Sequence, residues 1–516
     1  MEILASGARV EGSTSRWTEA LSRQPAVLVA AVIALGAALR FACLSQNSIW
    51  ADEAYVAWLT RFGWRDLLSI VRASDAHPPL YYLLVKAWVG VAGTGEVALR
   101  VPSACASTLS IPLTYALMRR LFPAPAGLLA ALLVSVSPLE VMAGQEARMY
   151  PLLGVLTLAS TLALLLSIET GKARWRIGYA ALGTLMLYTH YLGALVLIAH
   201  GCWVAVYERP RIAGWAAGLA VIGLLFSPWL PSCWHQITHV HGYAAYRETA
   251  TYLDPGDLLG LFAFGGSLFG MSSYFFPGSV GLGRQLIATL PFIAVPAAAF
   301  LAARRDARGL MLLGLPLLVT LGLMFAVTLV RPMFYPRWFS YLLPFYAAFL
   351  ALGIVELAAR GRSYHRAVAA TLTIGLLLYS VPVLQHYYTD PAFRPYRWRA
   401  AAALVEKYAR PEDFFLFSNA AAERSLSYYY RQPHPSLTVD VMGDARSTGR
   451  PLPLTPDQAT ELSLRYPHVW LVTTLPFKAP MAEDLRQALG GAFRVVGGRD
   501  FAGVWVHLLE AKSSRR

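Results

Sequence analysis

Long apolar runs separated by short basic clusters fill this sequence from Pro25 to Leu384. Each run is close to the roughly 20 residues that an α-helix needs to cross the hydrocarbon layer of a membrane. Over the whole chain, 56% of the residues are hydrophobic and 14% are charged, whereas about a quarter are charged in soluble proteins. The pattern predicts a multi-span membrane protein and excludes a large soluble enzyme, a disordered chain and a fibrous repeat.

The basic clusters predict the direction of each span. Cytoplasmic loops carry an excess of Lys and Arg, so the net charge of +14 is typical of such loops rather than of nucleic-acid binding. If every cluster is cytoplasmic, two spans separate consecutive clusters. The apolar runs then give about eleven transmembrane helices, with the N-terminus inside: 25–43, 99–118, 124–143, 149–168, 177–189, 191–207, 213–230, 286–303, 309–330, 338–357 and 367–384.

This topology divides the chain into three parts. Residues 1–24 form a cytoplasmic tail, and residues 25–384 form an all-α transmembrane module with long outer loops at 44–98 and 231–285. The leftover apolar segments 79–92 and 258–275 are expected as interfacial or re-entrant helices on the outer side. Arginine-rich usage suggests a bacterial chain, and hence the inner (plasma) membrane.

Residues 385–516 have normal charge content and predict a small extracytoplasmic α/β domain. Its pattern indicates helices at 399–408, 420–430 and 481–489, and strands at 414–417, 469–473, 494–496 and 504–509. Tyr428, Tyr429, Tyr430 and Arg431 either stack a sugar or, the reading we favour, pack into the domain core.

The first outer loop contains two adjacent carboxylates, Asp52 and Glu53. The apolar residues that follow share one helical face, which predicts an amphipathic helix on the membrane surface. Carboxylates at a helix start also interact favourably with the helix dipole, so a capping pair is one interpretation. The other is a reactive site, since aromatic surroundings at the lipid interface raise the proton affinity of a carboxylate.

Three further elements lie at outer span ends. In the first, Asp75 lies two residues before His77, and Pro78 holds the His77 backbone extended. The segment is therefore either a rigid turn with an incidental histidine or a paired imidazole and carboxylate. The second element contains Glu146 and Arg148. These two residues are either a structural ion pair or residues of a functional site. The third includes Arg331, Tyr335 and Arg337, whose guanidinium groups are either interfacial anchors or suited to a lipid phosphate.

Together, the Asp52-Glu53 pair, the Asp75-Ala76-His77-Pro78-Pro79-Leu80 segment, the Gln145-Glu146-Ala147-Arg148 turn and the Tyr335-Pro336-Arg337-Trp338 segment resemble the GT-C membrane glycosyltransferases. The closest likeness is to the superfamily of the protein O-mannosyltransferases and aminoarabinose transferases, including the RgtA/B/C/D-like enzymes of lipopolysaccharide assembly. It covers roughly residues 25–385. The resemblance implies a GT-C fold and glycosyl transfer on the outer face of the membrane, in cell-envelope glycan biosynthesis.

The resemblance also implies substrates and roles. The donor would be a sugar linked to polyprenyl phosphate, and the acceptor a hydroxyl of a glycan, lipid or protein; membrane lipids are further partners and nucleic acid is not. Asp52 matches the catalytic carboxylate that accepts the acceptor proton, and Glu53 matches the adjacent acid that orients it. The remaining matches fall into two groups: His77, Arg331 and Arg337 near the donor phosphate, and Asp75, Glu146, Arg148 and Tyr335 lining the cavity on the acceptor side.

The chain departs from the aminoarabinose transferases at one motif, where Ala76-His77-Pro78 replaces Glu-Lys-Pro. A metal site built on that Glu therefore lacks its ligand. His235, His239 and His241 offer other candidate ligands, but interfacial histidines are the reading we favour. No cofactor is assigned, and a divalent metal is left open.

Two other functions fit a multi-span chain of this kind. A transporter or flippase for a lipid-linked sugar predicts charged residues in the middle of spans, whereas the acids here cluster at outer span ends. A ligase that moves a preassembled glycan uses the same donor phosphate and is not separated by sequence.

Overall fold

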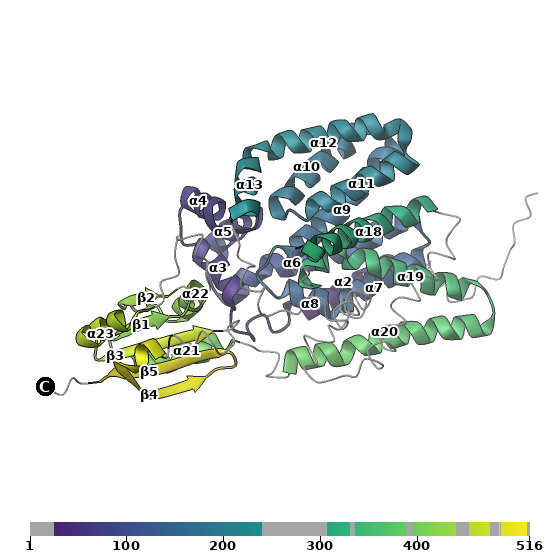
Figure 1. Cartoon of the computed structure of the whole chain (residues 1–516). Helices are drawn as coiled ribbons and strands as arrows, with labels where there is room; N and C mark the ends of the chain where they lie inside the picture. Colours follow the sequence, from purple (N-terminus) through teal and green to yellow (C-terminus); the bar gives the residue numbers. More distant parts are fainter. Residues whose placement is uncertain are drawn as a thin grey trace, which may run out of the picture.

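The computed structural model describes residues 25–239, 307–330, 336–389, 396–439, 454–474, 485 and 487–512. It shows a helical bundle joined to a region with a mixed β-sheet (Figure 1). The bundle helices are α2 (Pro25–Phe41), α6 (Glu96–Leu121), α7 (Ala124–Val136), α8 (Pro138–Gly144), α9 (Tyr150–Thr170), α10 (Ala173–Thr189), α11 (Gly193–Tyr207), α12 (Ile212–Phe226), α13 (Leu230–His239), α18 (Ala307–Val330), α19 (Leu343–Ala359) and α20 (Ser363–Thr389).

Among the described residues, six helices are long and apolar enough to span a membrane, or seven if the bent pair α7–α8 counts as one span. The prediction of a multi-pass membrane protein is thus confirmed, but the count of eleven is not. Helices α2 and α11 are apolar but short, and the predicted span 286–303 lies outside the described residues, as does the segment 258–275. Helix α13 continues to His239, so the start of the predicted loop 231–285 is helical.

The predicted single span 124–143 is broken at Ser137, where α7 and α8 meet at 58°. Pro138 lacks a backbone N–H, and Ser137 is extended (φ −62°, ψ 120°), so carbonyl groups at the end of α7 lose their helical donors. The buried Arg40 guanidinium replaces these donors, bonding to Val134 O and Ser135 O at 2.9 Å each. Arg40 therefore stabilises the break, because these carbonyl groups lie among buried residues and would otherwise lack donors.

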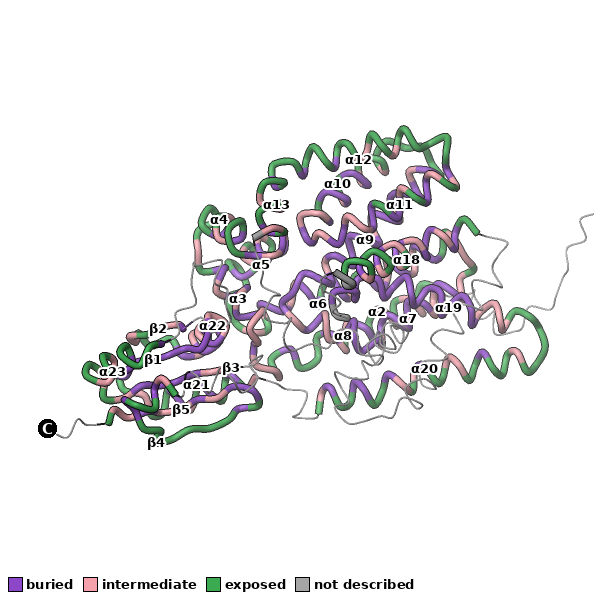
Figure 2. Tube along the Cα trace, viewed as in Figure 1, coloured by how far each residue is buried: buried purple, intermediate pink, exposed green. Residues whose placement is uncertain are grey.

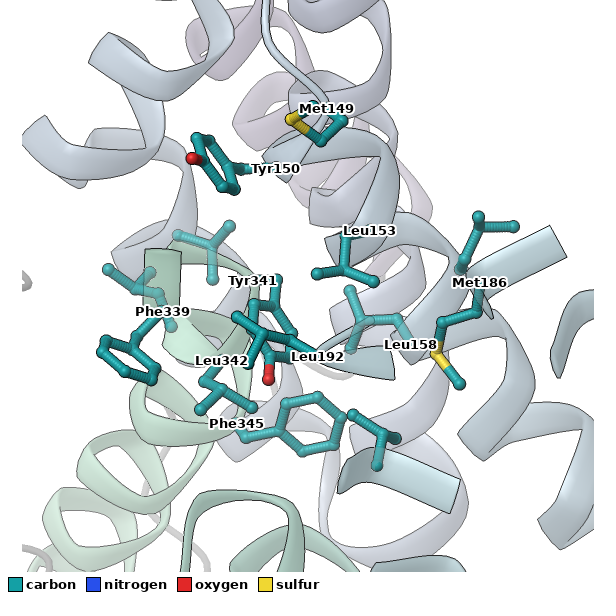
Figure 3. Packing of buried hydrophobic residues seen from close by; sticks show 14 of the residues in the cluster. Met149, Tyr150, Leu153, Leu158, Met186, Leu192, Phe339, Tyr341, Leu342 and Phe345 are labelled. Atoms are coloured by element: carbon teal, nitrogen blue, oxygen red, sulfur yellow. The ribbon is translucent and has the colours of Figure 1, made fainter. Parts of the chain in front are cut away.

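The core of the bundle lies around α9. Most of this helix is buried, as is α19, whereas α12 and α20 present mainly exposed residues (Figure 2). The 3-10 helix η5 (Pro336–Leu342) packs against α9, and Tyr341 and Phe345 belong with Leu153 of α9 to the apolar cluster of Figure 3. A Cβ added at Gly154 would lie 3.5 Å from the Tyr341 Cα, an ordinary van der Waals contact, so η5 and α9 pack closely here without needing a glycine.

Three short helices connect α2 to α6 and lie between the bundle and the sheet (Figure 1). They are α3 (Ala51–Leu59), α4 (Trp64–Ser74) and α5 (Leu80–Ala92). Helix α3 confirms the helix predicted after Asp52, and α5 confirms helical structure in the predicted segment 79–92.

The C-terminal sheet has the strand order β2-β1-β3-β5-β4. Strand β1 is parallel to β2 and β3, whereas β5 is antiparallel to β3 and β4. Alternating side chains of β1 enter two apolar clusters on opposite faces, with Phe415 in one and Leu416 in the other. The elements are α21 (Trp398–Tyr408), β1 (Phe414–Phe417), α22 (Ala420–Tyr429), β2 (Ser436–Thr438), α23 (Pro456–Arg465), β3 (His468–Thr474), β4 (Phe493–Asp500) and β5 (Val504–Ala511).

Candidate active site

Asp52 and Glu53 lie in the first turn of α3, where both carboxylates suit the helix dipole. Adjacent residues of a helix point in directions about 100° apart, so the two side chains reach different surroundings. The Glu53 side chain is 1% exposed and the Asp52 side chain 32%. The pair is therefore divided into a buried acid and an accessible one.

Both oxygens of Glu53 are held by buried donors. Arg100, in the first turns of α6, donates from Nε to Oε1 and from Nη2 to Oε2, both at 2.7 Å. The Ala147 N–H donates to Oε1 at 2.9 Å, and the Trp50 N–H to Oε2 at 3.4 Å. Glu53 thus joins three segments: the start of α3, helix α6 and the turn before α9.

The same turn brings Arg148 to Asp52. The Arg148 Nε lies 3.7 Å from Asp52 Oδ2, within ion-pair distance, and its guanidinium lies 5.9 Å from the centre of the Tyr150 ring. The side chain is 6% exposed, and its Nε makes no hydrogen bond with any described residue. Arg148 is therefore a buried cation with a free donor beside the accessible carboxylate.

Gln145 and Glu146, at the start of that turn, have different surroundings. Gln145 is buried, and its side-chain amide donates to the carbonyls of Leu39, Arg40 and Ala42 at 3.1, 3.2 and 2.7 Å. It ties the turn to the end of α2. Glu146 is half-buried at the same end of the bundle.

Asp75 and His77 form a rigid pair between α4 and α5. Asp75 Oδ1 accepts hydrogen bonds from the His77 backbone N–H at 2.9 Å and from its Nδ1 at 3.0 Å. Burial by itself would raise the pKa of Asp75, but the hydrogen bond and the charge of His77 outweigh burial, so the pKa is lowered. Since Nδ1 carries the proton shared with Asp75, the second ring nitrogen, Nε2, is left for another partner.

The sequence did not single out His190, which lies beside this pair. Its ring centre is 5.1 Å from that of His77 and 5.9 Å from that of Tyr150. His190 Nδ1 accepts the Leu192 N–H at 3.1 Å, so a neutral ring carries its proton on Nε2. Burial, followed by the charges of His77 and Arg148, lowers the pKa of His190 well below its usual range. The one available signal was its position in a short turn between two predicted spans.

Of the predicted donor-side residues, the structure describes only His77 fully. Arg331 and Tyr335 lie outside the described residues, and Arg337 is the second residue of η5, where its backbone but not its side chain is described. The η5 backbone packs on α9, which starts two residues after Arg148. Among the described residues, no three His, Cys, Asp or Glu side chains gather where they could hold a metal, and His241 lies outside them.

Comparisons with known proteins give one family match and several similar folds. Residues 76–232 match the family described as dolichyl-phosphate-mannose-protein mannosyltransferase. No curated protein sequence gave a significant match.

Several solved structures have a similar fold. ArnT from Cupriavidus metallidurans, in the apo state, is 16% identical, with a TM-score of 0.62 over 95% of this chain and 98% of ArnT. ArnT bound to undecaprenyl phosphate has a TM-score of 0.61, with 16% identity over 93% of this chain and 97% of that one. The archaeal oligosaccharyltransferase AglB from Archaeoglobus fulgidus, in complex with an inhibitory peptide and a dolichol-phosphate, is 11% identical, with a TM-score of 0.55 over 97% and 75% of the two chains.

Proposed function

We propose that this chain is a membrane glycosyltransferase related to the family matched at residues 76–232, and that it transfers a sugar from a polyprenyl-phosphate donor to an acceptor hydroxyl. The donor class is supported by the similar fold of ArnT, which was solved with undecaprenyl phosphate, and of AglB, which was solved with dolichol-phosphate. Asp52 acts as the general base, and transfer takes place on the outer face of the membrane.

One observation carries the proposal: Asp52 is the accessible member of an acid pair whose other member, Glu53, is fixed by Arg100. A general base must reach the proton that it removes, and its carboxylate must keep one orientation. Asp52 is exposed enough to meet a hydroxyl, while Glu53 anchors the turn of α3 on which Asp52 lies. Glu53 is therefore a positioning residue in this proposal.

The leaving group is polyprenyl phosphate, and negative charge builds up on it as the glycosidic bond breaks. His77 suits this charge when its ring is an imidazolium, because Nδ1 then donates to Asp75 and Nε2 can donate to the phosphate. Arg148, expected above on the acceptor side, adds a buried positive charge beside Asp52. Arg331 and Arg337 are proposed to contact the same phosphate. Asp75, Glu146 and Tyr335 are proposed on the acceptor side.

The ion pairs support one cytoplasmic end of the bundle. Glu208 binds Arg211 at 2.5 Å and Arg308 at 2.8 Å, and Arg120 lies 3.4 Å from Glu169. Arg211 and Arg308, from two different basic clusters, thus meet at Glu208, which fits the excess of cationic residues in cytoplasmic loops. Asp52 and Arg148 come from turns at the opposite ends of these helices, which we assign to the outer face of a bacterial plasma membrane.

The test uses a strain that lacks the gene. Lipid-linked sugars extracted from it should contain an unspent donor, identified by mass spectrometry. Complementation with the wild-type gene should remove the accumulated lipid, and complementation with the Asp52→Asn gene should not. If no lipid-linked sugar accumulates in either the deletion or the Asp52→Asn strain, the proposed donor is wrong.

A further inference from the structure

The Asp75 carboxylate has one satisfied oxygen and one unsatisfied oxygen. Oδ1 accepts both hydrogen bonds from His77, whereas Oδ2 is buried and accepts none from the described residues. Asp75 as a whole is 6% exposed, so bulk water does not solvate this oxygen. A buried charged acceptor without a donor costs more free energy than a neutral one, and such groups normally find a partner. Oδ2 therefore points to a donor that comes from outside the chain.

Two tyrosine hydroxyls share this environment. Tyr55 lies on α3 and Tyr82 on α5, which pack against each other, and the two rings meet edge to face with centroids 6.0 Å apart (Figure 1). Each hydroxyl oxygen is buried and makes no hydrogen bond with a described residue. Burial, followed by the charge of Asp75, raises the pKa of both hydroxyls, which shows that they lie close to that carboxylate. Three buried polar groups, from α3, from α5 and from the turn between α4 and α5, are thus gathered without partners.

These groups lie about one helical turn from Asp52. Tyr55 follows Asp52 by three residues on α3, and side chains with this spacing are neighbours, about 5–6 Å apart between their Cβ atoms. Arg148, 3.7 Å from Asp52 Oδ2, also acts through its charge on Asp75. A molecule whose hydroxyl meets Asp52 can therefore reach Tyr55 and Asp75 with an adjacent part of the same unit.

We propose that Tyr55, Asp75 and Tyr82 form a subsite that binds neighbouring hydroxyl groups of a sugar unit in the acceptor. A hydroxyl group donates one hydrogen bond and accepts two. One sugar hydroxyl can therefore donate to Asp75 Oδ2 while it accepts from one tyrosine, and its neighbour can bond to the second tyrosine. This inference rests on the proposed function, because it names the acceptor of the Asp52 site as a glycan or glycolipid. A serine or threonine of a protein acceptor has no second hydroxyl for the subsite.

The charges around the subsite favour an uncharged hydroxyl over an amine or an acid. Arg148 and, when its ring is protonated, His77 lie near Asp75 and would repel an ammonium group. Asp75 itself would repel a carboxylate or a phosphate. Uncharged hydroxyl groups are the ligands that both the carboxylate and the two phenols can bind.

Binding of simple methyl glycosides to the full-length protein tests the subsite without any transfer reaction. The protein is held in phosphatidylcholine nanodiscs, which carry no sugar, and is first saturated with undecaprenyl phosphate to close the donor phosphate site. Saturation-transfer NMR should detect at least one of methyl glucoside, methyl galactoside and methyl mannoside, and should not detect ethanol, which has a single hydroxyl. The Tyr55→Phe/Tyr82→Phe variant should bind the glycoside about tenfold more weakly, because two hydrogen bonds are lost.

The melting temperature separates a binding role of the two hydroxyls from a structural one. Neither hydroxyl has a partner in the described part of the protein, so the Tyr55→Phe/Tyr82→Phe variant without sugar should melt at the wild-type temperature or slightly above it. Tyr179→Phe is the matched control. The Tyr179 hydroxyl accepts the Trp215 Nε1–H at 3.1 Å, so its loss should lower the melting temperature and leave glycoside binding unchanged.

The proposal is overturned if none of the three glycosides binds the wild type, or if the double Phe variant binds them as well as the wild type does. It is also overturned if the melting temperature of the double Phe variant falls as that of Tyr179→Phe does, because the hydroxyls would then be bonded within the protein.

A last arm separates the acceptor sugar from the donor sugar. Asp52→Asn protein, which should not turn over, is loaded with the lipid-linked sugar extracted from the deletion strain, and the glycoside should still bind. Displacement of the glycoside would mean that the subsite holds the donor sugar, and would overturn the acceptor assignment. Glycoside binding that persists in a wild-type protein without transfer activity would count against the proposed function alone.

Discussion

Arg100 and Glu53 form a buried, two-point ion pair, with both N–O distances 2.7 Å and side chains 4% and 1% exposed. Arg100 also donates to the carbonyls of Leu44, Asn47 and Ser48 at 2.5, 2.9 and 3.2 Å. One guanidinium thus fixes both the loop before α3 and the acid next to Asp52. The geometry of the proposed base therefore depends on Arg100.

Replacement of Arg100 by Met should therefore destabilise the protein strongly. Removal of one partner leaves the Glu53 carboxylate buried without compensation, at a cost of about 3–5 kcal/mol. Thermal unfolding in detergent measures this loss. Arg494→Met is the control, because Arg494 and Glu510 form an exposed pair whose loss should cost no more than about 1 kcal/mol. Equal shifts in the two variants would contradict the anchoring role.

His77→Gln should weaken binding of undecaprenyl phosphate more than binding of the acceptor. A hydrogen bond to a charged group contributes about 1.5–3 kcal/mol, so a loss of about tenfold or more in donor affinity is expected. Asp75→Asn should have a similar but smaller effect, because the imidazole loses the carboxylate that orients it. Unchanged donor affinity in both variants would remove His77 from the phosphate site.

His190 makes the free energy of unfolding of the protein depend on pH. Its pKa is lowered in the folded protein, so between that pKa and about 6.5 the unfolded chain binds the additional proton. The contribution of neutral, buried His190 to the free energy of unfolding is fully present above about pH 6.5. It is lost as the pH falls below about 6.5, by up to about 1.4 kcal/mol per pH unit. The unfolding temperature of His190→Gln should therefore fall less than that of the wild type between pH 7 and pH 5. Parallel curves for the two proteins would show that His190 is not buried in the neutral form.

Cysteine labelling tests the orientation in the membrane. All four native cysteines are free, and three of them, Cys43, Cys105 and Cys202, are exposed. All four are therefore first replaced by Ala. In intact cells an impermeant thiol reagent should label Ser69→Cys and Glu461→Cys, which lie in α4 and α23. Lys172→Cys, in a basic turn, should react only after the cells are opened. Labelling of Lys172→Cys in intact cells would reverse the topology.

Local patterns in the sequence predicted most of the elements. Strand β1 lies where Phe414–Phe417 predicted it, and α21, α22, β3 and β5 begin and end within two residues of the predicted bounds. Strand β2 was missed, because Ser436–Thr438 is too short and polar to stand out from the surrounding loop. Residues 124–143 were predicted as one continuous span because most of them are apolar. Pro138 was the local signal of the break between α7 and α8.

The partners of the site residues could not be predicted from local patterns. Asp52, Asp75, His77 and Arg148 were recognised because each lies in a short polar segment between apolar runs. Arg100 is 47 positions from Glu53, and a single arginine at a span end is equally typical of an interfacial anchor. Only the three-dimensional structure brings these two residues together, and the same is true of His190 and His77.

The most direct measurement is the turnover of purified Asp52→Asn protein with the identified donor and acceptor, beside its melting temperature and its affinity for undecaprenyl phosphate. Asn has the shape of Asp but cannot accept a proton. We expect sugar transfer to fall by a factor of at least about a hundred while stability and donor affinity stay near wild-type values. Turnover close to that of the wild type would show that another group deprotonates the acceptor.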